Sequence, residues 1–215
     1  MAPIIKIKPM KEHFKLAHSQ HSINPYDEML KVLSGIIPIS KEEYGLVKTL
    51  FKFRVFPKNR ILLAMEDYWV AMFFINHGII RIYYMSEDGR EFNKGFFFQG
   101  MFLWPIAPSA RNYPSRFIIE TMDQCETLIC DLRGFRKTLQ MLGYWDKFSL
   151  FHAEWLADDK AIREADFLLL SAQERYLKFV ESYKEIADRI PDYHIASYLG
   201  ITNVALSRIK KNLFF

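Results

Sequence analysis

The chain contains only two cysteines, Cys125 and Cys130, in 215 residues. Two thiols exclude a disulfide framework and a four-cysteine iron–sulfur cluster. If one strand carried both, their odd spacing would place them on opposite faces, so we interpret them as ordinary strand residues rather than a redox pair. A reducing, cytoplasmic location is expected.

Long apolar runs are also missing. No stretch of about 18 uncharged apolar residues occurs, which excludes a transmembrane helix and gives no reason to expect a membrane partner. The first 15 residues are interrupted by lysine and proline, and they lack the apolar core of a signal peptide.

Residue patterns typical of enzymes and metal sites are absent from the sequence. No Ser/His/Asp or Cys/His arrangement, phosphate-binding loop or metal-ligand spacing occurs. His13, His18 and His21 lie close together, but their spacing does not align all three on one helical face. We therefore expect no enzyme, no metal and no cofactor, and we interpret residues 1–25 as a basic, mobile arm.

Charge and aromatic content point to partners and to strands. The net charge of +4 permits an anionic partner without requiring one. Aromatic residues make up 16% of the chain, with 19 phenylalanines among them. This content favours β-strands and tightly packed positions.

Helical and strand-like patterns alternate along the first 130 residues. Ser40 and Glu43 form a capping-box pair that predicts the start of a short helix. The apolar side expected for this helix comprises Leu46, Val47, Leu50 and Phe51. Over residues 53–129, short β-branched and aromatic runs alternate with turn residues, including the hairpin dipeptide Asp88-Gly89. This spacing predicts a sandwich or jelly roll.

After Leu132 the hydrophobic periodicity becomes helical. One long stripe is formed by Phe148, Phe151, Trp155, Ile162 and Leu169. The stripe predicts either packing within the chain or the seam of a dimer, and periodicity alone does not separate the two. A second capping box, Ser171 with Glu174, predicts the start of another helix.

Residues 192–209 carry the most specific pattern of the sequence. They predict a helix, a tight turn and a second helix. Ala196 allows two helices to cross closely, Gly200 gives the backbone freedom for the turn, and Thr202 is a natural N-cap. Small, Gly and apolar residues at these offsets are typical of a DNA-binding helix-turn-helix.

The charge of this segment agrees with DNA binding. No acidic residue follows Asp192, whereas Arg208, Lys210 and Lys211 occur within four positions. A positive, acid-free helix is favoured by the release of counterions from DNA. The other interpretation is a plain pair of helices with a solvated basic tail.

Two motif blocks resemble the Crp/Fnr family of bacterial transcriptional regulators. The first consists of FINHGIIRIYY at 74–84, EDGREF at 87–92 and GFF at 95–97. The second consists of SAQERY at 171–176 and IPDYHIASYLGIT at 190–202. The resemblance runs from about Tyr26 to the end. It implies an α+β fold with a cyclic-nucleotide-binding-like double-stranded β-helix (jelly roll), a long dimerisation helix and a C-terminal helix-turn-helix domain.

The resemblance also implies domain boundaries and partners. We expect an arm over 1–25, a sensor domain over 26–142, a dimerisation helix over 143–170 and a helix-turn-helix domain over 171–215. The implied partners are double-stranded DNA and a second copy of the chain, which would make the long apolar stripe a dimer seam. RNA polymerase and a small-molecule effector are further partners that the family allows. Many members continue into a β-hairpin wing, and its DNA contacts are expected to be missing here.

Residues for DNA contact follow from the family's recognition helix, which opens with an Arg and a Glu that read bases and has another Arg one turn later. The matching positions are Asn203, Val204 and Arg208. Arg208 keeps a guanidinium suited to a guanine edge or a phosphate, whereas Val204 offers only apolar contact, so the operator should differ from the family's best-known sequence. Phosphate contacts are expected from Thr202, Ser207, Lys210 and Lys211.

The effector cassette departs from the family pattern. Cyclic-nucleotide binders use a Gly-Glu pair for the ribose and an Arg-Ser or Arg-Thr pair for the phosphate, where this chain has Trp104-Pro105 and Ser115-Arg116. We expect no binding of cyclic AMP, because the carboxylate is missing and a shift by one position turns the arginine to the other strand face. One hypothesis is an apolar or aromatic effector with one acidic group, contacting Phe102, Trp104, Arg111 and Arg116. The other is a degenerate pocket, filled by its own side chains, with no effector.

Haem sensing within the family needs an axial ligand, and His77 lies in a plausible region. The family is commonly polar at this position, so haem is not expected. His152 and His194 are interpreted as helix-surface or interface residues.

The leading hypothesis is a homodimeric, sequence-specific transcriptional regulator whose β-roll biases the dimer between two geometries. The alternative is a ligand-sensing or protein-interaction module that has lost specific DNA binding. Val204 and the expected lack of a wing motivate this alternative.

Overall fold

The computed structural model describes residues 24–214. The three histidines and most of the basic arm expected over 1–25 lie outside the described residues. Over the part that is described, no helix combines the length and the apolar character needed to cross a membrane. In the same part, no group of three metal-binding side chains is present.

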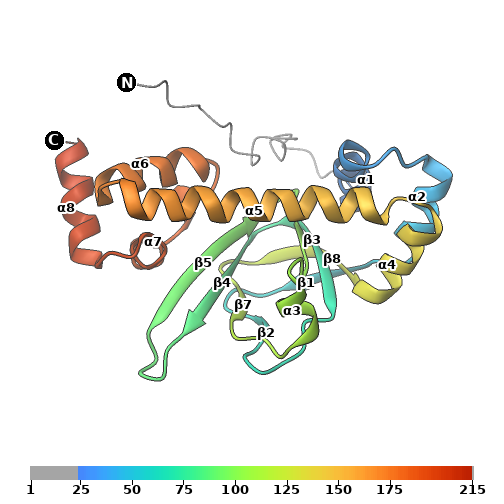
Figure 1. The fold of residues 1–215 in the computed structure, drawn as a ribbon, viewed down its shortest axis with the longest axis horizontal. Helices are drawn as coiled ribbons and strands as arrows, with labels where there is room; N and C mark the ends of the chain where they lie inside the picture. Colours follow the sequence, from blue (N-terminus) through green and yellow to red (C-terminus); the bar gives the residue numbers. More distant parts are fainter. Residues whose placement is uncertain (1–23, 215) are drawn as a thin grey trace.

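One long helix spans the molecule, with a β-roll packed along its middle (Figure 1). The strands are β1 Lys52–Phe56, β2 Ile61–Leu63, β3 Ala71–His77, β4 Ile79–Met85, β5 Glu91–Phe98, β6 Phe102–Leu103, β7 Ile118–Thr121 and β8 Cys125–Asp131. The helices are α1 Pro25–Ile36, α2 Lys41–Lys48, α3 Pro108–Asn112, α4 Leu132–Met141, α5 Trp145–Leu169, α6 Ala172–Ser182, α7 Asp192–Leu199 and α8 Asn203–Phe214.

The β-roll consists of two four-stranded antiparallel sheets. Their strand orders are β1-β8-β3-β6 and β2-β7-β4-β5, which is the double Greek-key arrangement of a jelly roll. The hairpin expected at Asp88-Gly89 joins β4 to β5, and Gly89 takes a φ of 79° there. The mixed fold with a jelly roll, predicted from the sequence, is confirmed; the short strand β6 was not predicted.

Two apolar cores lie on the two faces of the first sheet. Along β3, Phe73 and Ile75 point into the core between the two sheets, whereas Met72 and Phe74 join the core under the helices. Because both faces of β3 are covered, its sequence is apolar at consecutive positions rather than alternating. The adjacent phenylalanines Phe73 and Phe74 thus belong to different cores.

The two cysteines follow the same alternation on β8. Cys125 belongs to the core between the sheets and Cys130 to the core under the helices, so their prediction as residues of opposite strand faces is confirmed. Burial raises the pKa of the Cys125 thiol to about 12 and also raises that of Cys130. Cys125 also packs tightly against the β3–β4 turn. Gly78 in this turn has a φ of 101°, and a Cβ on Gly78 would lie 2.6 Å from the Cys125 Sγ.

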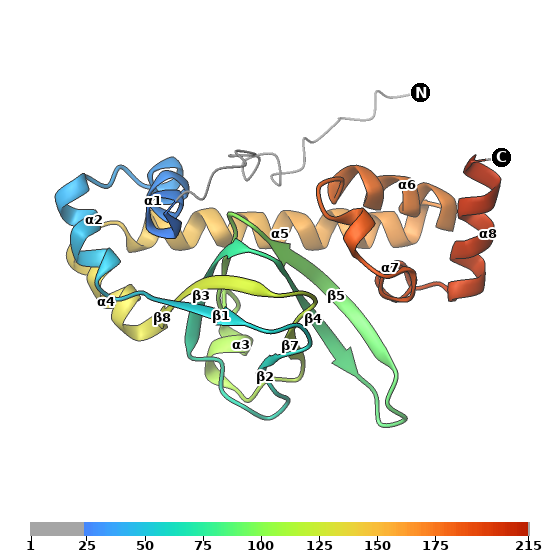
Figure 2. The ribbon, with the colours of Figure 1, turned by 180° about the vertical axis from the view of Figure 1, so that it is seen from behind.

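The N-terminal helices cover one end of the roll (Figure 2). The capping box of Ser40 and Glu43 starts α2, as predicted. The apolar side predicted for this helix was partly wrong. Val47 and Phe51 are buried, but Leu46 is 50% exposed, and Tyr44 packs inward in its place.

The long helix α5 divides the predicted apolar stripe between two environments. Phe148 and Trp155 are 0% and 6% exposed because they pack against the chain's own core, whereas Leu169 is 79% exposed. The prediction of a single continuous dimer seam through all five residues is therefore wrong. The exposed side of α5 carries a different row of apolar and small residues, spaced three to seven apart: Leu150, Ala153, Ala157, Ala161 and Leu168.

The C-terminal helices pack against the roll and against the end of α5 (Figures 1 and 2). Phe96 of β5 inserts among three aromatic rings of this unit, with centroid distances of 5.5–6.1 Å. Those rings belong to Phe179, Tyr183 and Tyr198. The C-terminal unit is therefore seated on β5 by an aromatic cluster.

Candidate DNA interface and effector cavity

Helices α7 and α8 form the helix-turn-helix that the sequence predicted. Gly200 lies in the left-handed region with φ of 68°, and its missing side chain leaves space for Phe167 of α5, which a Cβ would approach to 3.0 Å. Ala196 and Leu206 are buried where the two helices meet. Thr202 caps α8, because its Oγ1 accepts a hydrogen bond of 3.1 Å from the Ala205 N–H.

The outward side of α8 brings most of the predicted DNA-contact residues together. They follow the spacing of one helical face, and all are exposed: Thr202, Asn203, Val204, Ser207, Arg208 and Lys211. Val204 is 63% exposed, which places an apolar side chain in solvent. The opposite side of the helix, with Leu206 and Ile209, packs on the core.

Lys210 differs from its neighbours on α8. Its Nζ lies 2.8 Å from the Asp192 carboxylate at the start of α7, and this ion pair raises the pKa of Lys210. The pair ties the two helices together. It also neutralises the one acidic residue of the two-helix segment, so the net charge of the outward face comes from Arg208 and Lys211.

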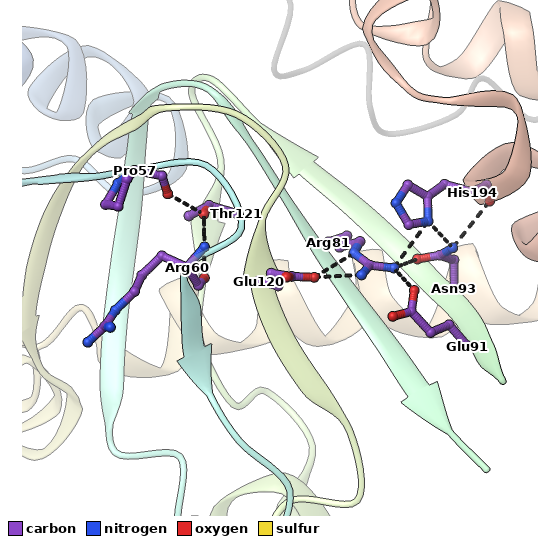
Figure 3. A network of polar contacts seen from close by, with 8 residues as sticks. All are labelled: Pro57, Arg60, Arg81, Glu91, Asn93, Glu120, Thr121 and His194. Carbon is purple, nitrogen blue, oxygen red and sulfur yellow. Dashed lines mark hydrogen bonds and ion pairs between the residues drawn. The ribbon is translucent and has the colours of Figure 1, made fainter. Parts of the chain in front are cut away.

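A buried polar contact joins the helix-turn-helix to the β-roll (Figure 3). Arg81 of β4 forms ion pairs of 2.5 Å with Glu120 of β7 and with Glu91 of β5. Its Nη1 also lies 3.1 Å from Nδ1 of His194 on α7, and Asn93 Nδ2 lies 3.2 Å from the same nitrogen. Since Arg81 and Asn93 both donate, Nδ1 must accept, and His194 is neutral with its proton on Nε2.

The backbone of β5 strengthens this contact. Ser197 of α7 accepts a hydrogen bond of 2.9 Å from the Asn93 N–H and donates one of 2.7 Å to the Glu91 carbonyl. Arg163 of α5 donates to the carbonyls of Asn93, Lys94 and Tyr198. One arginine of the long helix thus holds both β5 and the end of α7.

This contact predicts an acid-sensitive stability. Burial and the positive charge of Arg81 lower the pKa of His194 to about 4. Between pH 6.5 and pH 4, His194 is therefore protonated in the unfolded chain but not in the folded chain. The free energy of unfolding should decrease as the pH is lowered through that window. Urea unfolding of a His194→Gln variant should show a shallower fall. His77→Gln, at an exposed strand end, is the control and should keep the wild-type slope; equal slopes in all three proteins would contradict the assignment.

His152 was predicted at a helix surface or an interface; it is fully buried, which contradicts the surface alternative, and its ring lies against Phe102 and Trp104 of the roll. Its ring packs 4.3 Å from that of Phe148, and Nδ1 donates to the Phe148 carbonyl at 2.9 Å. Burial lowers the pKa of His152 to about 4. The interface interpretation is correct for His194.

A cavity of about 70 Å³ lies between the β-roll and α5. Phe102 and Trp104, predicted as effector contacts, line it. Arg111 and Arg116 do not: Arg116 is exposed, and the Arg111 guanidinium donates to the carbonyls of Pro105 and Ile106. The charged side chains in the lining are those of Lys94, Asp159 and Lys160, which sequence reasoning missed.

Comparison with known proteins identifies the architecture. The sequence matches no protein-family model and no curated protein. The structure is similar to CLP, the c-di-GMP-responsive global regulator of Xanthomonas campestris, with a TM-score of 0.64 and 15% identity over 81% of this chain and 91% of that one. It is also similar to a CooA variant from Carboxydothermus hydrogenoformans, with a TM-score of 0.62 and 20% identity over 90% of this chain and 85% of that one.

A Crp/Fnr-family transcriptional regulator from Eubacterium rectale gives a TM-score of 0.61 at 16% identity, over 82% of this chain and 84% of that one. In each case the match covers most of both chains. The likeness stated from the sequence motifs is confirmed at the level of the fold: the chain has the architecture of the Crp/Fnr-family transcriptional regulators.

Proposed function

We propose that this protein is a homodimeric, sequence-specific DNA-binding transcriptional regulator. The observation that carries the proposal is the outward side of α8, where polar and basic side chains are exposed on one face with no carboxylate among them. A helix of this kind fits the major groove, with Arg208 suited to a guanine edge and Asn203 to adenine. Thr202, Ser207 and Lys211 would meet phosphates.

Dimer formation is supported by the exposed side of α5. Leu150, Ala153, Ala157, Ala161 and Leu168 form an exposed row along the helix. Small residues in the middle of such a row allow two helices to approach closely, and leucines at its ends supply apolar contact. Sedimentation of the purified protein gives its oligomeric state.

The cavity supports the expectation that cyclic AMP is not the effector. Its volume of about 70 Å³ is well below that of ordinary ligand pockets, roughly 300–1,000 Å³. Trp104 and Pro105 are both buried at the positions where the family places its ribose-binding pair.

Salt dependence tests the proposal. Lys211→Ala should weaken binding to all duplexes alike and reduce the slope of log K against log salt by about one unit per protomer, because one phosphate contact is lost. Lys210→Ala is the matched comparison. Since Lys210 is already paired with Asp192, its loss should change the slope less. Equal slopes for wild type and Lys211→Ala would contradict the placement of α8 on DNA.

A further inference from the structure

The cavity between the roll and α5 combines aromatic walls with a group of cations. Trp69, Phe97, Phe117 and Trp155 belong to its apolar lining, and Lys94 and Lys160 are its basic members. Asp159 is paired with the adjacent Lys160 at 2.9 Å, so the lining carries a net positive charge.

Lys94 owes its position to an irregularity in β5. In the β4–β5 ladder, Gly95 pairs with Ile82 and Asn93 with Tyr83, so Lys94 is an extra residue without a partner. Such a bulge re-aims the side chain, and bulges are common beside functional sites. The Lys94 carbonyl, freed from the ladder, accepts a hydrogen bond of 2.5 Å from Arg163.

No carboxylate of residues 24–214 forms an ion pair with Lys94. Its Nζ instead lies 4.6 Å from the centroid of the Phe117 ring and 5.6 Å from that of Tyr84. Burial, together with Lys160 and Arg163, lowers the pKa of Lys94 to about 8. A half-buried ammonium with cationic neighbours and no counter-ion is unfavourable, and an anion at this point would relieve it.

Two further groups in the lining have unused hydrogen-bonding capacity. The indole N–H groups of Trp69 and Trp104 are buried, and neither has an acceptor in the described part of the chain. Both belong to side chains that line the cavity. Buried donors are almost always paired in folded proteins, so this wall also favours a ligand that brings acceptor oxygens.

We propose that the cavity binds a small apolar monoanion, such as a short-chain carboxylate, with Lys94 as the partner of its charged group. The apolar part packs among the aromatic walls, and Lys160 adds positive charge at the same site. Lys94 directly follows Asn93 in the chain, and Asn93 holds the helix-turn-helix on β5. A ligand bound to Lys94 is therefore close to this contact. Only the role of this ligand as an effector rests on the proposed function. Its binding does not, because binding is measured without DNA.

Butyrate is a suitable probe, with butyramide as its uncharged counterpart. Three of the four tryptophans line the cavity, so intrinsic fluorescence reports its occupancy directly. We expect saturable binding of butyrate in the millimolar range or tighter, and at least tenfold weaker binding of butyramide. Affinity for butyrate should fall as the pH rises through about 8, where Lys94 loses its proton. The charged groups around Lys94 are Lys160, Arg163 and Asp159, and Tyr84 is the nearby phenol.

Lys94→Met removes the charge and keeps an apolar side chain of similar length. We expect this variant to lose the preference for butyrate over butyramide and to unfold at the same or a higher urea concentration than wild type, because a half-buried charge is gone. Lys137→Met, on the exposed side of α4, should keep the preference. Equal affinities for butyrate and butyramide, no saturable change with butyrate, or a preference that survives in Lys94→Met would each overturn the proposal.

Discussion

Replacing Arg208 with alanine is expected to weaken binding to the selected operator by about 1–3 kcal/mol per protomer, which is roughly 5- to 150-fold for each half-site. The side chain is exposed near the middle of α8, where a recognition helix meets base edges. The loss should be much smaller on a scrambled duplex, so selectivity falls together with affinity. Fluorescence anisotropy with both duplexes measures the two effects.

Arg208→Lys separates base recognition from charge. Lysine keeps the positive charge but lacks the two-pronged guanidinium that fits a guanine edge. We expect it to bind the scrambled duplex like wild type and the operator less tightly. If Arg208→Ala bound the operator as well as wild type, the assignment of α8 as the recognition helix would be wrong.

Replacing Arg81 with methionine should lower the free energy of unfolding by about 3–5 kcal/mol, because it leaves buried carboxylate charge without a counter-ion. Glu120 has a side chain that is 14% exposed, and it has two hydrogen bonds from Arg81. Asn93 and His194 would also lose a donor, which loosens the contact between α7 and the roll. Urea unfolding followed by circular dichroism measures the loss.

Two further variants show whether the effect comes from the buried charge. Arg81→Met combined with Glu120→Gln should recover part of the lost stability, since the uncompensated carboxylate is gone. Arg90→Met removes an exposed arginine of the same hairpin, whose partner is Asp88, and should leave the unfolding midpoint unchanged. An Arg81→Met protein as stable as wild type would contradict the role of this network.

The fold was largely predictable because local signals are strong in this sequence. Turn residues such as Asp88-Gly89 and Gly200 mark the ends of short β-branched and aromatic runs and of helical runs. The two capping boxes, at Ser40 and Ser171, are local by nature, since each is made by two residues within four consecutive positions. The conformation at such turns and helix starts is determined by residues adjacent in the chain, and these can be identified in the sequence.

The cavity was harder to predict because its geometry depends on distant segments. Lys94 faces it only because β5 is bulged opposite Ile82 and Tyr83, and no sequence pattern marked that bulge. Arg116 was chosen by alignment to a family pattern, and Arg111 was added as a second possible anion ligand. The structure turns Arg111 to nearby carbonyls and Arg116 to solvent.

The long helix shows a similar limit. Periodicity found an apolar stripe on α5, but it could not tell which residues the roll would cover. Phe148 and Trp155 are buried by aromatic neighbours such as Phe102 and Phe97, far away in sequence. Ala153, Ala157 and Ala161 give almost no hydrophobic signal, although they lie on the exposed side of the helix.

Binding to a pool of randomised duplexes tests the central claim most directly. The purified protein should select a sequence with inverted-repeat symmetry, with half-sites about one helical turn apart, because each protomer of a dimer presents one α8. Affinity should fall steeply with added salt. Undetectable or salt-insensitive binding across the whole pool at low salt would contradict a DNA-binding regulator and favour a ligand-sensing or protein-interaction module.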